Sequence, residues 1–418
     1  MNVQSKSVQD PRATKDLKRA SGAAAPEIHT KLVAADLKAR TDVVAVVAAA
    51  NAEAVDRDAR FPQEAITSAR SQRLLGIMVP HELGGEGASV SDVIDVCYML
   101  GRACSATAMI YAMHQTKVAC LIRHGRGSAW HERLLRHLCV EQLLLASSTT
   151  EGQAGGDVRK SAAAVEQLGS RITLERTATV ISYGEHADGI VTTARRSPEA
   201  AASDQILVAF LKQNYSLERI VNWDALGMRG TCSAGFTLKA TGENVQVLPA
   251  PYEKIHPQTM MPVAHLTWSG AWTGIAAGAV ERARLFVRNA ARKSDGQLPP
   301  GAAHLTRATA SLRTLRALVA SAAQRFEAAS RDEGALESID FQTAMNLLKV
   351  NASELAIATV MSSLQASGLS GYRNDSEFSI GRHLRDVLSS PIMINNDRIL
   401  ANVAAASLLS AVPAMLRD

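Results

Sequence analysis

Apolar residues recur at helical spacing through the first third of the chain. Between residues 28 and 145 they stand three or four positions apart amid many alanines, the repeat that puts side chains on one face of an α-helix. The clearest set is Leu32, Val33, Leu37, Val43, Val44 and Val47. Phe61-Pro62 ends that stretch, because proline disfavours helical backbone in the residue before it. The pattern predicts an N-terminal helical domain over residues 28–145.

The hydrophobic pattern changes between residues 146 and 262. Short β-branched and apolar runs are separated there by turn residues, which is typical of strands. The runs are 172–174, 179–182, 189–193 and 206–210. They predict a middle domain built as a small antiparallel β-barrel or sandwich between two helical blocks.

Helical spacing returns from residue 263 to 418. The stretches 302–333, 338–366 and 383–417 have lengths and apolar spacing that suit a four-helix bundle. The small residues at 276–279 would let two helices approach closely. We therefore predict an α+β fold, mostly α, with an N-terminal helical domain, a middle β-domain and a C-terminal four-helix bundle.

Composition agrees with a protein that folds in water. The chain has 418 residues, of which 47% are apolar, 20% charged and only 4% aromatic, ordinary values for a globular protein with closely packed helices. No run of 18 apolar residues lacks a charge, so we expect no membrane span. The N-terminal segment lacks the apolar core of a signal peptide, which favours a cytoplasmic location.

Charge and cysteines exclude some functions. The net charge is only +5, and residues 1–26 carry five basic against two acidic side chains. We expect residues 1–27 to be a disordered basic tail and see little support for nucleic-acid binding. The five cysteines form no CxxC pair, so buried free thiols are expected in place of disulfides or a metal site.

One polar loop stands out at residues 147–158. Its sequence is Ser-Ser-Thr-Thr-Glu-Gly-Gln-Ala-Gly-Gly-Asp-Val. Glycines let the backbone approach a ligand, because no Cβ intervenes. The hydroxyls and free backbone N–H groups suit a flat, carbonyl-rich or phosphate-bearing group. A plain surface turn would have much the same composition.

This loop resembles the T-E-P-x-x-G-S-D signature of the acyl-CoA dehydrogenase family of flavoproteins. Thr150, Glu151 and Asp157 keep its spacing, with Gly152 in place of proline and Gly156 in place of serine. Segments similar to other family motifs follow the family order: the glycine turn at 76–87, then 180–182, 226–233, 365–372 and 382–386.

The resemblance implies a cofactor and its contacts. The expected cofactor is FAD, with FMN less expected, and no metal. The positions that match flavin contacts in the family are Ser147, Thr149, Thr150, Gly155, Gly156, Val180 and Ser182, with Gln365 and Gly368 acting across a subunit boundary. Arg288, or else Arg292, would bind the FAD pyrophosphate. A homodimer or homotetramer is implied.

The resemblance breaks at the chemistry. A family dehydrogenase uses a glutamate to remove the proton α to a thioester while hydride leaves for the flavin. The corresponding position here is Ile394, and the alternative position on an earlier helix is Ala271. Ser269 and Trp272 replace the aspartate and arginine that relatives use for CoA. The expected substrate-binding residues are Tyr111, Ala271, Trp272 and Ile394.

Three functions stay open. An acyl thioester dehydrogenase would take its base from elsewhere, Asp397 being the nearest carboxylate, and would pass electrons to an electron-transfer flavoprotein. A flavin monooxygenase needs no such base; it would use His114, Tyr111 or Ser182 near the flavin, act on some other small molecule and need a flavin reductase. A binding or assembly subunit would keep the fold without the chemistry.

Overall fold

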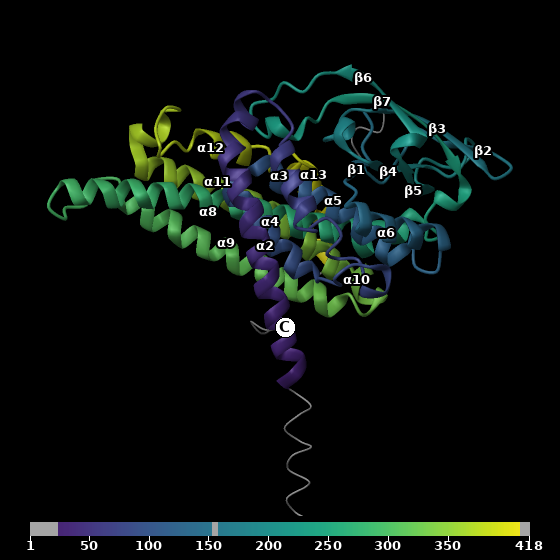
Figure 1. Ribbon diagram of the computed structural model, residues 1–418, viewed down its shortest axis with the longest axis horizontal. Coiled ribbons are helices and arrows are strands. Elements are labelled where there is room, and N and C mark those ends of the chain that lie inside the picture. The colour runs from purple at the N-terminus through teal and green to yellow at the C-terminus, as the bar shows by residue number, and fades with distance from the viewer. Residues whose placement is uncertain (1–23, 153–157, 410–418) are drawn as a thin grey trace, which may run out of the picture.

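The computed structural model describes residues 24–152 and 158–409 and divides into a helical part and a part made of strands (Figure 1). The strands gather at one side of the molecule, and the long helices α8, α9 and α11 run together across the rest. The predicted α+β architecture, mostly α, is confirmed. The predicted basic tail, 1–27, falls outside the described residues except for its last four, which begin α2.

Six helical elements make up the N-terminal part from residue 24 onward. The first helix is described from Ala24, and the connections between elements range from one residue, Cys104, to nine residues, 72–80. Their bounds are α2 (Ala24–Arg57), α3 (Gln63–Ser71), the 3₁₀ turn η1 (His81–Leu83), α4 (Val90–Ala103), α5 (Ser105–His124) and α6 (Ala129–Glu141). A capping box starts α4: Asp92 N donates to Ser89 Oγ, and Ser89 N donates to the Asp92 carboxylate.

The glycine turn before α4 has a packing role. A Cβ on Gly85 would lie 2.0 Å from the carbonyl oxygen of Val79, and Gly84 and Gly87 have φ of +89° and +61°. Side-chain-bearing residues rarely adopt such backbone. The turn is therefore built for a close approach of two chain segments.

The strands form two separate sheets. One has the order β1-β4-β5 and the other β2-β3-β7-β6. Their bounds are β1 (Leu145–Ser148), β2 (Val165–Leu168), β3 (Arg171–Ala178), β4 (Gly189–Arg195), β5 (Gln205–Leu211), β6 (Tyr215–Val221) and β7 (Gly235–Glu243). The pairing is antiparallel except between β1 and β4, where Leu145 is in register with Gly189. Of the two predicted forms, the sandwich is the one that fits.

The run 179–182 is not a strand, although its composition predicts one. It follows β3 as an irregular segment that bonds to the chain before β7, through Ile181 N to Ala234 O at 2.9 Å and Tyr183 N to Thr231 O at 2.8 Å. Tyr183 has φ of +45°, which turns the chain out of any extended ladder.

The C-terminal helices pack around α8. They are α7 (Tyr252–Ile255), the π-helical turn η6 (His256–Met260), α8 (Met261–Lys293), α9 (Ala302–Ala329), α10 (Glu333–Glu337), α11 (Ile339–Tyr372), α12 (Gly381–Val387) and α13 (Asn396–Leu409). Residues 261–280 of α8 are all buried, as expected of a helix surrounded by others. Where α8 crosses α4, a Cβ on Gly274 would lie 2.2 Å from Tyr98 O.

The predicted helix over 383–417 is two helices, α12 and α13, joined by residues 388–395. Pro391 lies in this connection, and Ile394 has φ of +49°, a conformation that no helix contains. Further along the bundle, α11 is interrupted at Gly368, whose φ of 53° and ψ of −135° are not helical.

The five cysteines are free thiols, four of them buried, as predicted.

Candidate functional site

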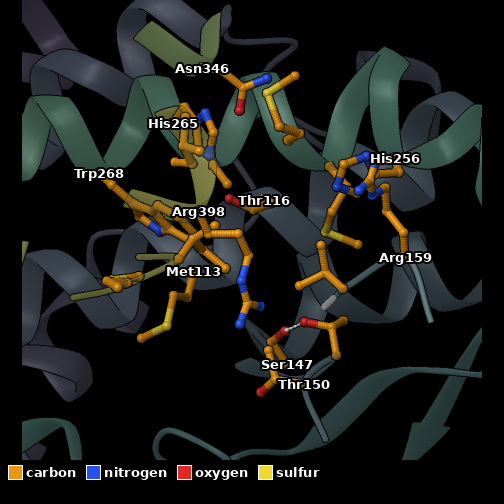
Figure 2. Close-up of a pocket in the computed structure, with 18 of the residues that line it drawn as sticks. Met113, Thr116, Ser147, Thr150, Arg159, His256, His265, Trp268, Asn346 and Arg398 are labelled. Atoms are coloured by element: carbon orange, nitrogen blue, oxygen red, sulfur yellow. Dashed lines mark hydrogen bonds between the residues drawn. The ribbon is translucent and has the colours of Figure 1, made fainter. Parts of the chain in front are cut away.

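A cavity of about 1200 Å³ lies where the sheets meet the helical part. Its walls come from α5, the end of β1, the turn η6, the first half of α8, the start of α11 and the connection from α12 to α13. Figure 2 shows Met113, Ser147, His265, Trp268 and Arg398 around it. The volume exceeds that of a typical pocket for one small molecule, about 300–1,000 Å³, and so leaves space for a flavin ring and a substrate.

Hydroxyl groups cover the wall on the sheet side. Ser182 Oγ lies 2.7 Å from Ser233 Oγ, which lies 2.8 Å from Thr231 Oγ1. Thr231 Oγ1 donates to Met228 O at 2.8 Å. All three hydroxyls line the cavity. Because each can donate or accept, this row suits the carbonyl and N–H edge of a flat heterocycle.

The loop after β1 adds a second group of hydroxyls. Ser147, Thr149 and Thr150 line the cavity, with Ser147 Oγ 3.5 Å from Thr149 Oγ1. The next residue, Glu151, is turned away from the cavity and only 3% exposed. Its carboxylate lies 3.1 Å from Arg176 Nη1 of β3 and accepts a hydrogen bond from Ser161 Oγ at 3.2 Å. The glutamate of the loop therefore fixes the loop, and its threonine faces the ligand space.

The α8 side of the cavity is aromatic and apolar. Met261, Ala264, His265 and Trp268 share one face of α8 at helical spacing and line the cavity. His265 Nδ1 lies 3.0 Å from Met345 O, and burial lowers the pKa of His265 to about 3. This imidazole is neutral at physiological pH and serves as a hydrogen-bonding wall residue. It carries no positive charge into the cavity.

Six of the predicted site residues meet at this cavity. Ser147, Thr149, Thr150, Val180, Ser182 and Ile394 all line it, although they come from three distant parts of the chain. Gly155 and Gly156 lie outside the described residues.

Tyr111 and His114 share a face of α5, as their spacing predicts, but that face does not line the cavity. Tyr111 Oη donates to Leu74 O at 3.1 Å. His114 Nε2 lies 2.8 Å from Leu75 O, and Leu145 N donates to His114 Nδ1 at 3.0 Å. Both side chains are fully buried, and burial lowers the pKa of His114 to about 4. These contacts tie α5 to the chain before α4 and to β1.

The remaining predicted residues lie apart from the cavity. Ala271 and Trp272 are fully buried on α8, beyond the cavity-lining turns. Asp397 is exposed at the start of α13, where its backbone N–H donates to Asn395 Oδ1 at 2.9 Å. Gln365, Gly368 and Arg288 are exposed near the far ends of α11 and α8.

Several residues of the cavity have no counterpart in the sequence-based predictions. They are Lys117, His256, His265, Trp268 and Arg398, among others. One signal was available: Lys117 is the only Lys, Arg, Asp or Glu between Ser105 and Leu121 of α5. The others lie at positions that only the packing of η6, α8 and α13 brings together.

Comparisons with known proteins agree with this geometry. The chain matches the family descriptions "Acyl-CoA dehydrogenase, N-terminal domain" over residues 37–142 and "Acyl-CoA dehydrogenase, C-terminal domain" over residues 258–409. Cyclohex-1-ene-1-carbonyl-CoA dehydrogenase of Geobacter metallireducens is 25% identical over 380 residues, which cover 88% of this chain and 95% of the relative.

Solved structures share the fold. FMN-bound TdsC from Paenibacillus sp. A11-2, a dibenzothiophene monooxygenase, has a TM-score of 0.79 and 18% identity, covering 90% of this chain and 98% of that one. Methanesulfinate monooxygenase MsuC from Pseudomonas fluorescens has a TM-score of 0.76 and 19% identity, with 90% and 97% covered.

The family match and the cavity together define a flavin-dependent oxidoreductase. The chain belongs to the acyl-CoA dehydrogenase family, whose members use FAD. Among residues 24–152 and 158–409, no helix is both long and apolar enough to cross a bilayer.

Proposed function

We propose that this protein is a flavin-dependent monooxygenase built on the acyl-CoA dehydrogenase fold. The observation that carries the proposal is that Ile394, which the resemblance to the family motifs aligns with the family's glutamate, lines the cavity. Its side chain cannot accept a proton. A bound flavin supplies two-electron redox chemistry and, when reduced, activates O2. Oxygen transfer of this kind needs no base to remove an α-proton.

The carboxylates that line the cavity give little support to proton abstraction. They are Asp204, Glu253 and Glu337. Asp204 is exposed and pairs with Arg196 at 3.1 Å, and Glu253 is exposed. Glu337 Oε1 accepts a hydrogen bond from Gln258 Nε2 at 2.7 Å. Asp397, the base expected for a dehydrogenase, is exposed and does not line the cavity.

The residues present fit a flavin. The row formed by Ser182, Ser233 and Thr231 would bind the polar edge of the ring, and Ser147 and Thr150 would hold its other side. Trp268 and Met113 would cover the ring region with apolar surface and exclude water. His114 and Tyr111, by holding α5 against β1, would position these groups without touching the flavin.

Dehydrogenation of an acyl thioester is the second candidate. It is favoured by the sequence relative from Geobacter metallireducens, which is named a dehydrogenase and matches 88% of this chain. In that case one of the lining carboxylates would be the base. The protein would then need an electron-transfer flavoprotein, whereas the monooxygenase would need a flavin reductase.

We also propose a homodimer or homotetramer. Gln365 and Gly368 are exposed, and so are the neighbouring apolar side chains of Leu369, at 71%, and Tyr372, at 74%. Exposed apolar groups of this size mark interaction surfaces when they cluster. A second subunit at this end of α11 would let Gln365 reach its FAD. The cytoplasmic location stays a prediction.

Anaerobic titration separates the two functions. The FAD-loaded protein is titrated with hexanoyl-CoA and with cyclohex-1-ene-1-carbonyl-CoA while the flavin absorbance is recorded. A monooxygenase keeps its flavin oxidised with both thioesters and takes up O2 when a flavin reductase and NADH are added. Stoichiometric bleaching by either thioester would establish dehydrogenation instead.

A further inference from the structure

Lys117 is a cavity-lining lysine buried within α5. Its side chain is 3% exposed, and its Nζ lies 2.8 Å from the thioether sulfur of Met260. A thioether is a weak acceptor. Within the described part of the chain, Lys117 has no carboxylate partner at ion-pair distance. A buried ammonium in this state costs free energy, and an anionic partner placed beside it would offset that cost.

Two further nitrogen-bearing side chains, His256 and Arg159, line the same part of the cavity. The η6 turn begins at His256 and ends at Met260, whose sulfur contacts Lys117. Lys117 and His256 therefore lie in one corner of the cavity, which we call the η6 corner. Figure 2 shows His256 and Arg159 together on the side of the cavity opposite Trp268. Two of the carboxylates that line the cavity lie near η6: Glu337 accepts from Gln258 of the same turn, and Glu253 is exposed three residues before His256. Neither of these carboxylates is hydrogen-bonded to the Lys117 ammonium, which contacts the Met260 thioether.

Met260 can give way to a ligand. Its unbranched side chain has three rotatable bonds and fills gaps adaptably. If it swings aside, the Lys117 ammonium is left with all three donors for an incoming acceptor. Burial lowers the pKa of Lys117 to about 8, so the group is still largely protonated at pH 7.

We propose that Lys117 binds an oxyanion on the substrate, a carboxylate, sulfinate or sulfonate, at the η6 corner of the cavity. The proposal rests on the cavity being the substrate site of the function proposed above. An ion pair formed in this dry corner discriminates strongly against uncharged analogues, because they leave the buried ammonium unpaired. The substrate class is therefore an acidic small molecule.

The test measures binding to the oxidised, FAD-loaded protein by calorimetry. The probes are glutarate, succinate and propane-1-sulfonate, each compared with its uncharged amide. We expect at least one anion to bind about 10-fold or more tightly than its amide, and Lys117→Met to abolish that preference. Lys349→Met is the matched control, because Lys349 is equally buried but does not line the cavity; it should keep the preference.

A second measurement guards against a purely structural role. Lys117→Met should raise the melting temperature of the substrate-free protein, because an unpaired charge is removed. Lys349→Met should lower it, because Lys349 Nζ donates to Asn396 Oδ1 at 2.7 Å. A lower melting temperature for Lys117→Met would overturn the inference.

Three further results would also overturn it. One is the absence of any preference for the anions. Another is that Arg398→Met loses the preference for the anion while Lys117→Met keeps it, which would show that Arg398 binds the oxyanion. The third is that Lys117→Met binds FMN more weakly than the wild type but binds the anions equally well. That result would show that Lys117 contacts a flavin phosphate. Because no turnover is involved, these results are independent of the bleaching titration.

Discussion

Glu151 and Arg176 form an ion pair whose atoms lie 3.1 Å apart and whose side chains are 3% and 0% exposed. The pair joins the loop that follows β1 to the middle of β3. Arg176 Nη1 also lies 3.2 Å from Thr193 Oγ1 on β4. Burial lowers the pKa of Arg176 to about 10, against the opposing effect of the Glu151 carboxylate. One side chain thus connects both sheets to the loop that lines the cavity.

Arg176→Met should be strongly destabilising. It leaves Glu151 as a buried carboxylate without its counter-charge, and breaking such pairs costs about 3–5 kcal/mol. Urea unfolding at pH 7 measures the free energy directly. The exposed pair Lys239–Glu218, at 3.3 Å, provides the control: Glu218→Gln should cost less than about 1 kcal/mol. Equal effects of the two variants would contradict the structural role of the buried pair.

The fold could be predicted because its signals are local. Helical spacing in α9 and α11 and β-branched runs in β4 and β5 follow from periodicity within each segment. The run 179–182 was misassigned as a strand because its composition is β-like, and only Tyr183 turns the chain. The break between α12 and α13 depends on the backbone of Ile394, which side-chain patterning does not encode.

The site was only partly predictable. Ser182 and Thr150 could be assigned to the candidate site by likeness to short family motifs, and both line the cavity. The spacing of Tyr111 and His114 correctly predicts that they share one face of α5. It does not predict what that face packs against, because this contact depends on the tertiary structure. Lys117 occupies the neighbouring face, and its burial follows from η6, a segment more than 100 residues away.

Stability should fall in acid because of His114. Its pKa is lowered to about 4, against about 6.5 in the unfolded chain. The unfolded state therefore binds more protons between pH 6.5 and 4, and stability is lost as the pH falls through that window. His114 alone should account for about 2 kcal/mol between pH 7 and pH 5. His265, with a pKa of about 3, adds in the same direction.

The contribution of His114 can be isolated by substitution. In His114→Gln, urea midpoints at pH 7 and pH 5 should differ less than in the wild type. The exposed His137 on α6 is the control, and His137→Gln should keep the wild-type difference. An unchanged pH dependence in His114→Gln would show that its ring is not the group that titrates.

The hydroxyl row should contribute to flavin affinity. Ser182→Ala removes one hydrogen-bonding group and leaves Ser233 without its 2.7 Å partner. A hydrogen bond of this kind contributes about 1 kcal/mol, so the dissociation constant of FAD should rise about fivefold. Fluorescence quenching of FAD measures it. The control is Ser216→Ala, at an exposed position of β6 away from the cavity, which should leave FAD binding unchanged. If Ser182→Ala also leaves FAD binding unchanged, the flavin lies elsewhere.

Ile394→Glu should introduce the proton acceptor that the wild type lacks. Ile394 is half-buried and packs against the core beside the cavity, so a carboxyl group there would have a raised pKa, as a general base requires. The left-handed backbone at φ +49° is also less unfavourable for glutamate than for a β-branched side chain. We expect hexanoyl-CoA to bleach the FAD of Ile394→Glu at least about 100-fold faster than that of the wild type. Ile394→Gln has nearly the same size without the proton acceptor and should stay at the wild-type rate. If the wild type already bleaches as fast as Ile394→Glu, another carboxylate serves as the base, and the protein is a dehydrogenase.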